Sequence, residues 1–326
     1  MKDFLAGCLF VLSVFACYMT AEAKTEPIDT LAGEWAQVRV SVACFRDAPA
    51  HSAQLITQAV MGTPLKLKFK SGQWYYAEMP DGYEGWVVDN SICEKNASEL
   101  ASWRGAERVT VTSLDPTYIW ATPDATSHRE RISDAVGGMI LEARPQRLSS
   151  SRVCVVLPDG REGWIDTACV TLTDVWASRT FDPKLILDNA YALEGTPYLW
   201  GGTSQKSMDC SGLTRICYFA NGILLLRDAS QQARTGTRID PDRWRECRPA
   251  DLLFFGNPDT GRVTHVALYD NGGDYVHASG MVKRNSLDGS SDKYLPIHFL
   301  NAVRIDGNED TPGIVRMINH PWYFNK

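Results

Sequence analysis

Residues 208–214 read Met208-Asp209-Cys210-Ser211-Gly212-Leu213-Thr214, and this segment guides the interpretation of the rest of the chain. The residues before it, Gly201-Gly202-Thr203-Ser204, are typical of a loop, and those after it are apolar at helical spacing. Cys210 is therefore predicted to lie near a helix N-terminus, where free N–H groups and the helix dipole favour a thiolate. The thiolate is the nucleophilic form of cysteine. Cys217 is expected to be a core thiol.

A nucleophilic cysteine requires a base, and the base requires an orienting partner. His265 and His277 lie twelve residues apart on two strand-like segments joined by the turn residues Asn271-Gly272-Gly273. Antiparallel strands can place two such side chains next to each other on one face. These two histidines are therefore the candidates. The other four histidines show no comparable pattern: His51, His128, His298 and His320.

The N-terminal half contains an internal repeat. The segment Met79-Pro80-Asp81-Gly82-Tyr83-Glu84-Gly85-Trp86-Val87 returns as Leu157-Pro158-Asp159-Gly160-Arg161-Glu162-Gly163-Trp164-Ile165, with six of nine positions identical. Such a repeat indicates two copies of one small domain. The Pro-Asp-Gly turns between β-rich segments predict small β-barrels over residues 32–93 and 105–172. The polar residues 94–104 are the expected linker.

The C-terminal part of the chain combines helix-like and strand-like sequence patterns. An aspartate cap and an early proline, Asp182-Pro183, predict a helix there, and a second helix is expected near Cys210. The segments 252–255, 265–269 and 274–277 are typical of antiparallel strands. Residues 181–326 are therefore predicted to form one mixed α+β domain. At 326 residues, the chain has room for all three domains.

The first 23 residues have the pattern of a secretory signal peptide, with an apolar run and the cleavage site Ala21-Glu22-Ala23. Two alternatives remain open: a retained membrane anchor, and lipoprotein processing at Cys17. Lipoprotein processing at Cys8 fits less well, because almost no apolar sequence precedes it.

Charge and cysteine content exclude several classes of partner. With 33 Lys and Arg against 39 Asp and Glu, the chain is acidic, which argues against nucleic acid or an anionic membrane as the main partner.

Seven cysteines follow the predicted signal peptide, so at least one thiol is unpaired. None has C-x-x-C spacing, so no zinc or other cofactor is expected. The candidate disulfides within the barrels are Cys44–Cys93 and Cys154–Cys169.

The motifs taken together resemble the NlpC/P60 cysteine peptidases. The matching segments are residues 198–202 (Tyr-Leu-Trp-Gly-Gly), 209–213 (Asp-Cys-Ser-Gly-Leu), 248–255, 264–269 and 276–278. The resemblance implies a papain-like α+β fold, in which Cys210 is the nucleophile, His265 the general base and His277 the orienting residue. It also implies that Tyr198 and the backbone N–H of Cys210 lie at the oxyanion site. Asp209 and Ser211 would line the cleft.

With two bacterial SH3-like domains, the chain is similar to the γ-D-glutamyl-L-diamino-acid endopeptidases, which cut peptidoglycan stem peptides. In that subfamily Asp228 would bind the free amine of L-Ala, although it could also simply cap a turn. Tyr83 would close the substrate cleft. The subfamily has a Glu where this chain has Gln54. Either one carboxylate is missing, or Glu78 or Glu84 replaces it.

The sequence therefore predicts an exported cysteine peptidase of the periplasm or cell envelope, acting as a monomer on stem peptides with a free N-terminal L-Ala. No metal is required, because the nucleophile is a thiolate. Two alternatives stay open. One is a non-catalytic wall-binding protein, and the other is an amidase or acyltransferase that uses the same residues.

Overall fold

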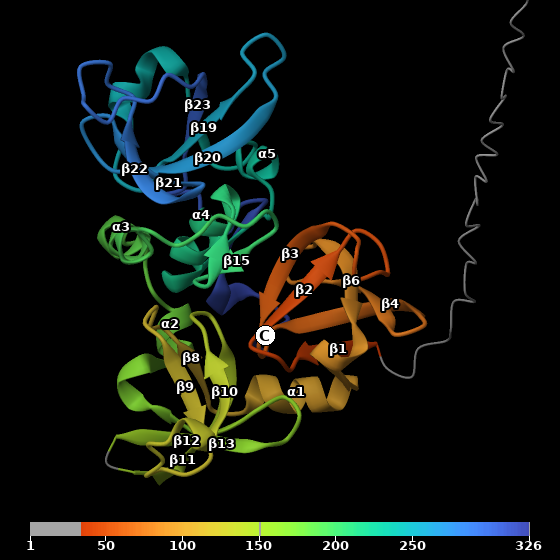
Figure 1. Cartoon of the computed structure of the whole chain (residues 1–326). Coiled ribbons are helices and arrows are strands. Elements are labelled where there is room, and N and C mark those ends of the chain that lie inside the picture. Colours follow the sequence, from red (N-terminus) through yellow and green to blue (C-terminus); the bar gives the residue numbers. More distant parts are fainter. Residues whose placement is uncertain (1–33, 150, 326) are drawn as a thin grey trace, which may run out of the picture.

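The computed structural model describes residues 34–149 and 151–325. The signal peptide predicted for residues 1–23, and the alternatives at Cys8 and Cys17, lie outside these residues. Three bodies surround a central helix, α4: two small β-domains and one mixed domain (Figure 1). Among the described residues, no helix has the length and apolar character needed to cross a bilayer.

The first barrel, residues 34–95, is a curved antiparallel sheet with strand order β3-β2-β6-β5-β4-β1-β7. Its strands alternate buried and exposed positions; in β2, Ala43 and Phe45 point into the core. A tight turn at Gly82, with φ of +76°, joins β5 to β6. The elements are β1 (Trp35–Val38), β2 (Val42–Arg46), β3 (Leu55–Val60), β4 (Pro64–Ser71), β5 (Trp74–Glu78), β6 (Glu84–Val88), η1 (Asp89–Ser91) and β7 (Ile92–Lys95).

The second barrel, residues 106–172, has the order β10-β9-β13-β12-β11-β8-β14, which is the same topology. Gly160, with φ of +83°, occupies the turn that corresponds to Gly82. The sequence repeat thus corresponds to a repeated fold. The elements are β8 (Arg108–Val111), β9 (Thr117–Trp120), η2 (His128–Glu130), β10 (Arg131–Ala135), β11 (Ile140–Leu148), β12 (Arg152–Val156), β13 (Glu162–Asp166), η3 (Thr167–Cys169) and β14 (Val170–Leu172).

The segment between the barrels is mostly helical, which its polar sequence did not indicate. Helix α1 (Ala97–Gly105) begins at a capping box in which Asn96 and Glu99 exchange hydrogen bonds of 2.8 and 2.9 Å. Leu100 and Trp103 bury the inner face of this helix. The connection is therefore a packed element.

The mixed domain contains a six-stranded antiparallel sheet of order β18-β23-β19-β20-β21-β22. Helix α3 begins at Asp182, whose carboxylate accepts hydrogen bonds from the N–H groups of residues 184 and 185. The elements are α2 (Thr173–Ala177), α3 (Pro183–Ala192), β15 (Thr203–Ser204), β16 (Ser207–Met208), α4 (Cys210–Ala220), β17 (Ile223–Leu225), α5 (Ala229–Gln232), β18 (Thr237–Ile239), η4 (Pro241–Glu246), β19 (Leu252–Gly256), β20 (Val263–Tyr269), β21 (Asp274–Ser279), β22 (Met281–Ser286), β23 (Phe299–Arg304), β24 (Ile314–Arg316) and η5 (Met317–Asn319).

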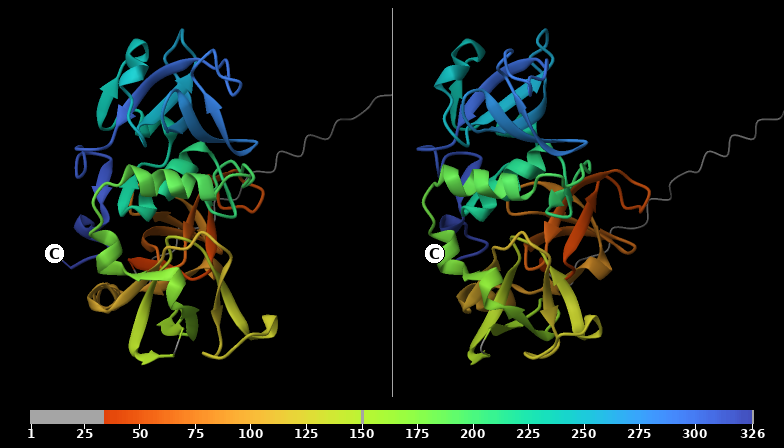
Figure 2. Two further views of the ribbon diagram at one scale, coloured as in Figure 1. Left: turned by 90° about the vertical axis from the view of Figure 1, so that its left-hand side faces the viewer. Right: turned by 60° about the vertical axis from the view of Figure 1, so that its left-hand side comes forward.

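Helix α4 is the element that the three bodies share (Figures 1 and 2). Leu213 and Cys217 pack into the core formed with the sheet. Phe219, on another face, packs with residues of α1, α2 and the C-terminal segment. Arg215 forms an ion pair with Asp81 of the first barrel, whose carboxylate is almost fully buried. Both barrels are thus tied to the helix that carries Cys210.

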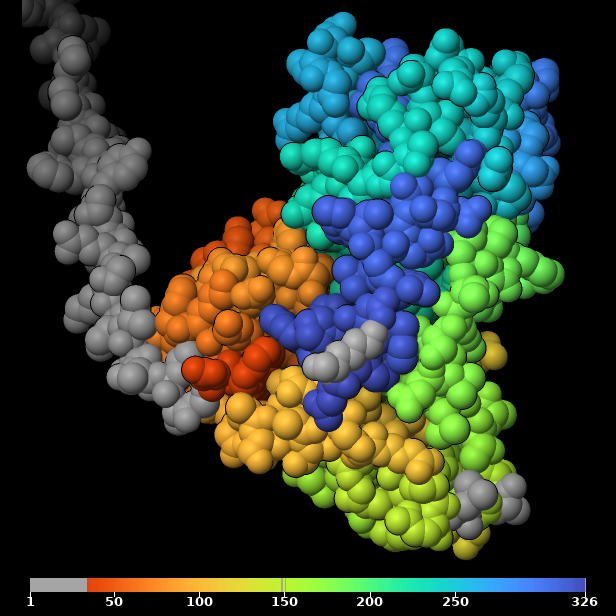
Figure 3. All heavy atoms as spheres, turned by 180° about the vertical axis from the view of Figure 1, so that it is seen from behind, coloured from red at the N-terminus to blue at the C-terminus, as the bar shows by residue number. Residues whose placement is uncertain are grey.

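The C-terminal segment, residues 317–325, lies against both barrels (Figure 3). His320 Nε2 lies 2.8 Å from the carbonyl oxygen of Pro80, and the Trp322 ring meets the Trp35 ring edge-on at 5.0 Å. Tyr323 is buried beside them. His320, which had no pattern in the sequence, therefore serves the junction between domains.

The seven described cysteines are all free thiols. The candidate disulfides Cys44–Cys93 and Cys154–Cys169 are therefore not formed in this structure. Cys44 accepts a contact from Gln58 Nε2 at 3.8 Å instead, on the neighbouring strand of its sheet.

Candidate active site

Cys210 is the first residue of α4. Asp209 caps the helix by accepting a hydrogen bond of 2.7 Å from the N–H of Gly212. Gly212 cannot carry a side chain, because a Cβ would lie 2.1 Å from the carbonyl oxygen of Gly202. The loop therefore lies directly on the start of the helix, and the Cys210 side chain is only 7% exposed.

Two histidines from the sheet form the next part of the site. His265 on β20 and His277 on β21 contact each other through Nε2 and Nδ1 at 2.7 Å. His277 Nε2 lies 2.9 Å from Asn285 Oδ1, and Asn285 Nδ2 donates to the carbonyl oxygen of Lys293 at 2.9 Å. The two predicted histidines are thus brought together, and Asn285 extends them into a chain of hydrogen bonds.

The direction of this chain fixes where the protons lie. Because the Lys293 carbonyl can only accept, the Asn285 amide donates to it and presents Oδ1 to His277. His277 must then donate from Nε2 and accept at Nδ1, which means that His265 donates from Nε2. In a neutral imidazole, Nδ1 of His265 is left as the unprotonated nitrogen. This nitrogen is the one that can take a proton.

The cysteine thiol lies beside this pair. The backbone N–H groups of Val266, the residue after His265, and of Ser211 lower the pKa of the Cys210 thiol. These donors and Arg227 favour the thiolate. Burial nevertheless raises the pKa of the Cys210 thiol to about 11, and the charge of Asp209 adds to this effect. Burial thus opposes the thiolate that the helix N-terminus favours.

The histidines are also neutral at rest. Burial lowers the pKa of His265 to about 3, helped by the charges of His277 and Lys283. Burial likewise lowers the pKa of His277 to about 4. A thiol next to an unprotonated imidazole is the correct starting point for one proton transfer that creates thiolate and imidazolium together.

Asp209 and Ser211 join a buried polar network around Arg227. The Arg227 guanidinium binds both carboxylate oxygens of Asp209, the Ser211 hydroxyl at 2.8 Å and Thr57 Oγ1 at 2.9 Å. Thr57 belongs to β3 of the first barrel. Asp209 and Ser211, which were predicted to line the cleft, are both buried, and their side chains hold the helix start in place.

Tyr83 and Asp228 meet across two domains. The Tyr83 hydroxyl lies 3.4 Å from Asp228 Oδ1, and burial together with the Asp228 charge raises the pKa of Tyr83 to about 12. Asp228 also stands at the start of α5, where its N–H donates to Gln231 Oε1 at 2.9 Å. Asp228 therefore caps a short helix and also directs a carboxylate oxygen toward the first barrel.

Tyr198 lies at the edge of the same site. Its backbone N–H donates to the carbonyl oxygen of Gly280 at 2.9 Å, which fixes the loop beside β22. Burial raises the pKa of Tyr198 to about 12, with Cys210 as the next contributor. The hydroxyl therefore stays protonated and can donate a hydrogen bond near Cys210.

The residues considered for the missing carboxylate lie elsewhere. Gln54 is exposed, and its backbone N–H donates to Asp47 Oδ1 at 2.9 Å. Glu78 and Glu84 both pair with Lys68, which neighbours them in the sheet. Neither glutamate is therefore a free carboxylate, and the hypothesis that one of them replaces the glutamate is not supported.

Comparison with known proteins identifies the family. The NlpC/P60 family model matches residues 195–304, and a bacterial dipeptidyl-peptidase SH3 domain matches residues 45–92. The probable endopeptidase NlpC of Escherichia coli is 37% identical over 121 residues, covering 36% of this chain and 75% of that protein. The chain belongs to the NlpC/P60 family. It is a cysteine peptidase, as the resemblance implied.

Other relatives of this NlpC/P60 peptidase match a larger share of the chain. A γ-D-glutamyl-L-lysine dipeptidyl-peptidase of Bacillus cereus is 27% identical, covering 69% of this chain and 67% of that protein. Dipeptidyl-peptidase 6 of Lysinibacillus sphaericus is 28% identical, with coverages of 74% and 87%. The crystal structure of an NlpC/P60 family protein from Bacillus cereus has a TM-score of 0.71 at 23% identity, covering 83% of this chain and 99% of that one. The last comparison confirms the fold.

Sequence reasoning missed several residues that this NlpC/P60 site uses. Asn285 follows His277 by eight positions and belongs to no motif that was recognised. Thr57 and Asp81 come from the first barrel, far along the chain from α4. Arg227 precedes Asp228 in the sequence, but its burial against Asp209, which defines its role, becomes visible only in the structure.

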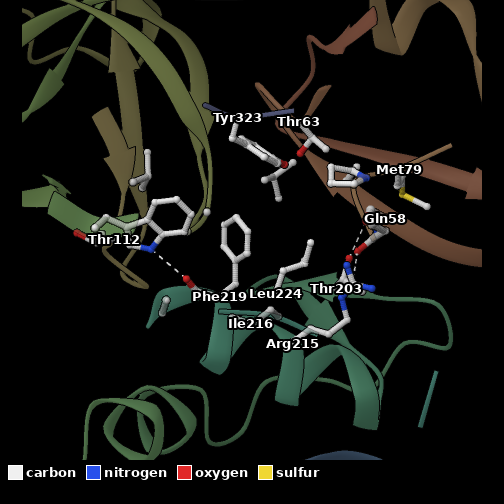
Figure 4. A pocket seen from close by; sticks show the side chains of 18 of the residues that line it. Gln58, Thr63, Met79, Thr112, Thr203, Arg215, Ile216, Phe219, Leu224 and Tyr323 are labelled. Carbon is white, nitrogen blue, oxygen red and sulfur yellow. Dashed lines mark hydrogen bonds between the residues drawn. The ribbon is translucent and has the colours of Figure 1, made fainter. Parts of the chain in front are cut away.

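An apolar cavity of about 100 Å³ lies at the junction on the other side of α4 (Figure 4). Met79 and Thr63 of the first barrel, Thr112 of the second, and Ile216 and Phe219 of α4 contribute to its wall. Peptide-sized ligands need roughly 300 Å³ or more. This cavity also contains none of the catalytic candidates, so it is a gap in packing and not the substrate site.

Proposed function

We propose that this peptidase hydrolyses the bond between the γ-carboxyl of D-Glu and the diamino acid in peptidoglycan stem peptides whose N-terminal L-Ala carries a free amine. The observation that supports the proposal is the contact between Tyr83 and Asp228, because Asp228 directs a carboxylate toward the first barrel and follows Arg227, which binds Asp209 next to Cys210. A carboxylate there can pair with an ammonium, whereas an acylated amine would leave it uncompensated.

The chemistry follows from the hydrogen-bond chain. His265 Nδ1 takes the thiol proton, and the Cys210 sulfur attacks the γ-carbonyl carbon of D-Glu. The backbone N–H of Cys210, which has no intrahelical acceptor, and the Tyr198 hydroxyl stabilise the oxyanion. The C–N bond then breaks as the imidazolium protonates the leaving amine.

Water completes the reaction. His265 removes a proton from the water that attacks the thioester, and the thiol is restored as the acid product leaves. His277 and Asn285 keep the imidazole in the tautomer that each half-reaction needs. This intact set argues against a purely scaffolding role for the domain.

We further propose that the protein is exported, on the basis of the leader-like residues 1–23. The measurement is the mass of the protein recovered from its native host. A chain that begins at Lys24 supports the proposal, and a lipid-modified Cys17 would indicate an anchored form instead.

The activity is tested with L-Ala-γ-D-Glu-diamino acid and its N-acetylated form, with products read by mass spectrometry. The free peptide should yield the L-Ala-D-Glu dipeptide, and the acetylated peptide should be cut far more slowly. Cys210→Ala should abolish cleavage with an unchanged melting temperature. Asp228→Asn should lower activity on the free peptide only. Equal rates on both peptides would contradict the role of Asp228.

A further inference from the structure

Lys283 lies beside the catalytic histidines without a function in the mechanism above. In the pairing of β21 with β22, Lys283 is directly opposite His277. Directly opposite residues of an antiparallel pair point to the same face of the sheet. The ammonium of Lys283 is close enough to lower the pKa of both His265 and His277.

Lys283 also lacks the carboxylate that its neighbours have. Arg284 pairs with Glu194 at 2.6 Å, and Lys293 pairs with Asp274 at 2.8 Å. Within residues 34–149 and 151–325, Lys283 has no ion pair, although its side chain is partly buried. A positive charge at this position opposes the imidazolium that forms during catalysis, and an anion bound to Lys283 offsets this effect.

An exposed apolar side chain lies next to this position. Met281, two residues before Lys283 in β22, is 50% exposed. Residues two apart in a strand point to the same face of the sheet. The cation therefore stands next to an apolar side chain on the face that also carries His277.

We propose that Lys283 binds the α-carboxylate of the diamino acid that leaves, and that Met281 contacts its methylene chain. This assignment rests on the proposed function and specifies its leaving-group side. A stem tripeptide ends in that carboxylate, whereas in a longer stem the same carbon is an amide. The peptidase should therefore prefer the tripeptide.

The binding of this carboxylate also serves the chemistry. An anion at Lys283 neutralises the charge that opposes protonation of His265. The imidazolium required for expulsion of the amine then forms more readily when the correct substrate is bound. Lys283 is thus a specificity residue whose effect reaches the base through its charge.

The test compares L-Ala-γ-D-Glu-L-Lys with its C-terminal carboxamide. A charge-assisted hydrogen bond corresponds to about ten- to a hundredfold in kcat/KM, so the wild type should prefer the acid by that factor. Lys283→Met should remove the preference by lowering the rate on the acid alone, and Lys283→Arg should keep it. Lys184→Met, at an exposed lysine of α3, is the matched control and should behave as wild type.

A second readout is the pH profile. Loss of the ammonium raises the pKa of the base, so the acid limb of kcat/KM should move to higher pH in Lys283→Met but not in Lys184→Met. A wild type that cuts acid and amide equally, or a Lys283→Met variant that still prefers the acid, would overturn the assignment. If the wild type cut neither peptide, the proposed function itself would fail.

Discussion

At the scale of single residues, the site depends on one continuous chain of hydrogen bonds from His265 to the Lys293 carbonyl. Removal of the base itself, in His265→Ala, should lower kcat by ~10²–10⁴-fold. His277→Ala should lower kcat by the same factor as His265→Ala or by a smaller one, because His277 orients the base and does not transfer the proton. Asn285→Ala should lower kcat by up to about 10²-fold, because the imidazole rings of His277 and His265 would no longer be held in place. Steady-state kinetics on the free tripeptide provides the measurement.

His298→Ala is the control for this series, because His298 has no contact with the chain of hydrogen bonds. A large loss in His298→Ala, together with an active His265→Ala protein, would mean that the base has been misassigned.

The two histidines also set the acid stability of the fold. Their folded pKa values, about 3 and about 4, lie below the ordinary value of 6.5, so the unfolded chain binds more protons between these limits. The contribution of these two histidines to the free energy of unfolding should therefore be fully present above pH 6.5 and decrease as the pH falls toward 3. For His265 alone, the loss between pH 6.5 and 4 is about 3 kcal/mol.

Urea unfolding across this range measures the effect. His265→Asn should flatten the dependence, because asparagine does not titrate. A pH dependence identical to that of the wild type would show that His265 is not neutral in the folded protein.

The catalytic candidates could be found from sequence because each lies in a local pattern: a loop before a helix for Cys210, and a hairpin for His265 and His277. Asn285 and Thr57 could not, because nothing local marks them and only the tertiary fold brings them to the site. The burial of Cys210 could not be predicted for a related reason. The helix start is visible in the sequence, but the burial that raises the pKa of the thiol depends on the loop that covers it.

At the scale of elements, the ion pair between Arg215 of α4 and Asp81 joins the helix to the turn of the first barrel. Arg215→Met leaves the nearly buried Asp81 carboxylate without its cation, with only the Tyr83 backbone N–H as a donor, which should cost about 3–5 kcal/mol of unfolding free energy. The matched control is Lys184→Met, which breaks an exposed pair with Asp188 on α3 and should cost less than 1 kcal/mol. Equal costs in urea unfolding would contradict the structural role of Asp81.

The elements themselves were predicted unevenly. The two barrels and the strands around both histidines follow from alternation and from the repeated Pro-Asp-Gly turn. Helix α1 was not predicted from the sequence, because most of its residues are polar and only Leu100 and Trp103 are buried. Its capping box, Asn96 with Glu99, was the signal that could have identified it.

At the scale of the whole molecule, the first barrel contacts Asp228 and Arg227 of the mixed domain through Tyr83 and Thr57, whereas the second barrel makes no such contact through the residue that corresponds to Tyr83. Tyr83 contacts Asp228, but its repeat counterpart Arg161 pairs with Asp159 of its own turn. Tyr83→Phe should therefore reduce the discrimination between free and N-acetylated tripeptide several-fold. Arg161→Ala should leave it unchanged. A loss of discrimination in Arg161→Ala would contradict the assignment of amine recognition to the first barrel.

The sharing of α4 by three bodies has a consequence for how the protein melts. One face of α4 packs into the core formed with the six-stranded sheet, and another packs with α1, α2 and the C-terminal segment. Arg215 of α4 also forms an ion pair with the first barrel. No body can separate without exposing apolar surface of this one helix, so the sequence modules are not independent thermodynamic units. Calorimetry should record a single transition, and the amides of α4 should exchange with solvent only through global unfolding.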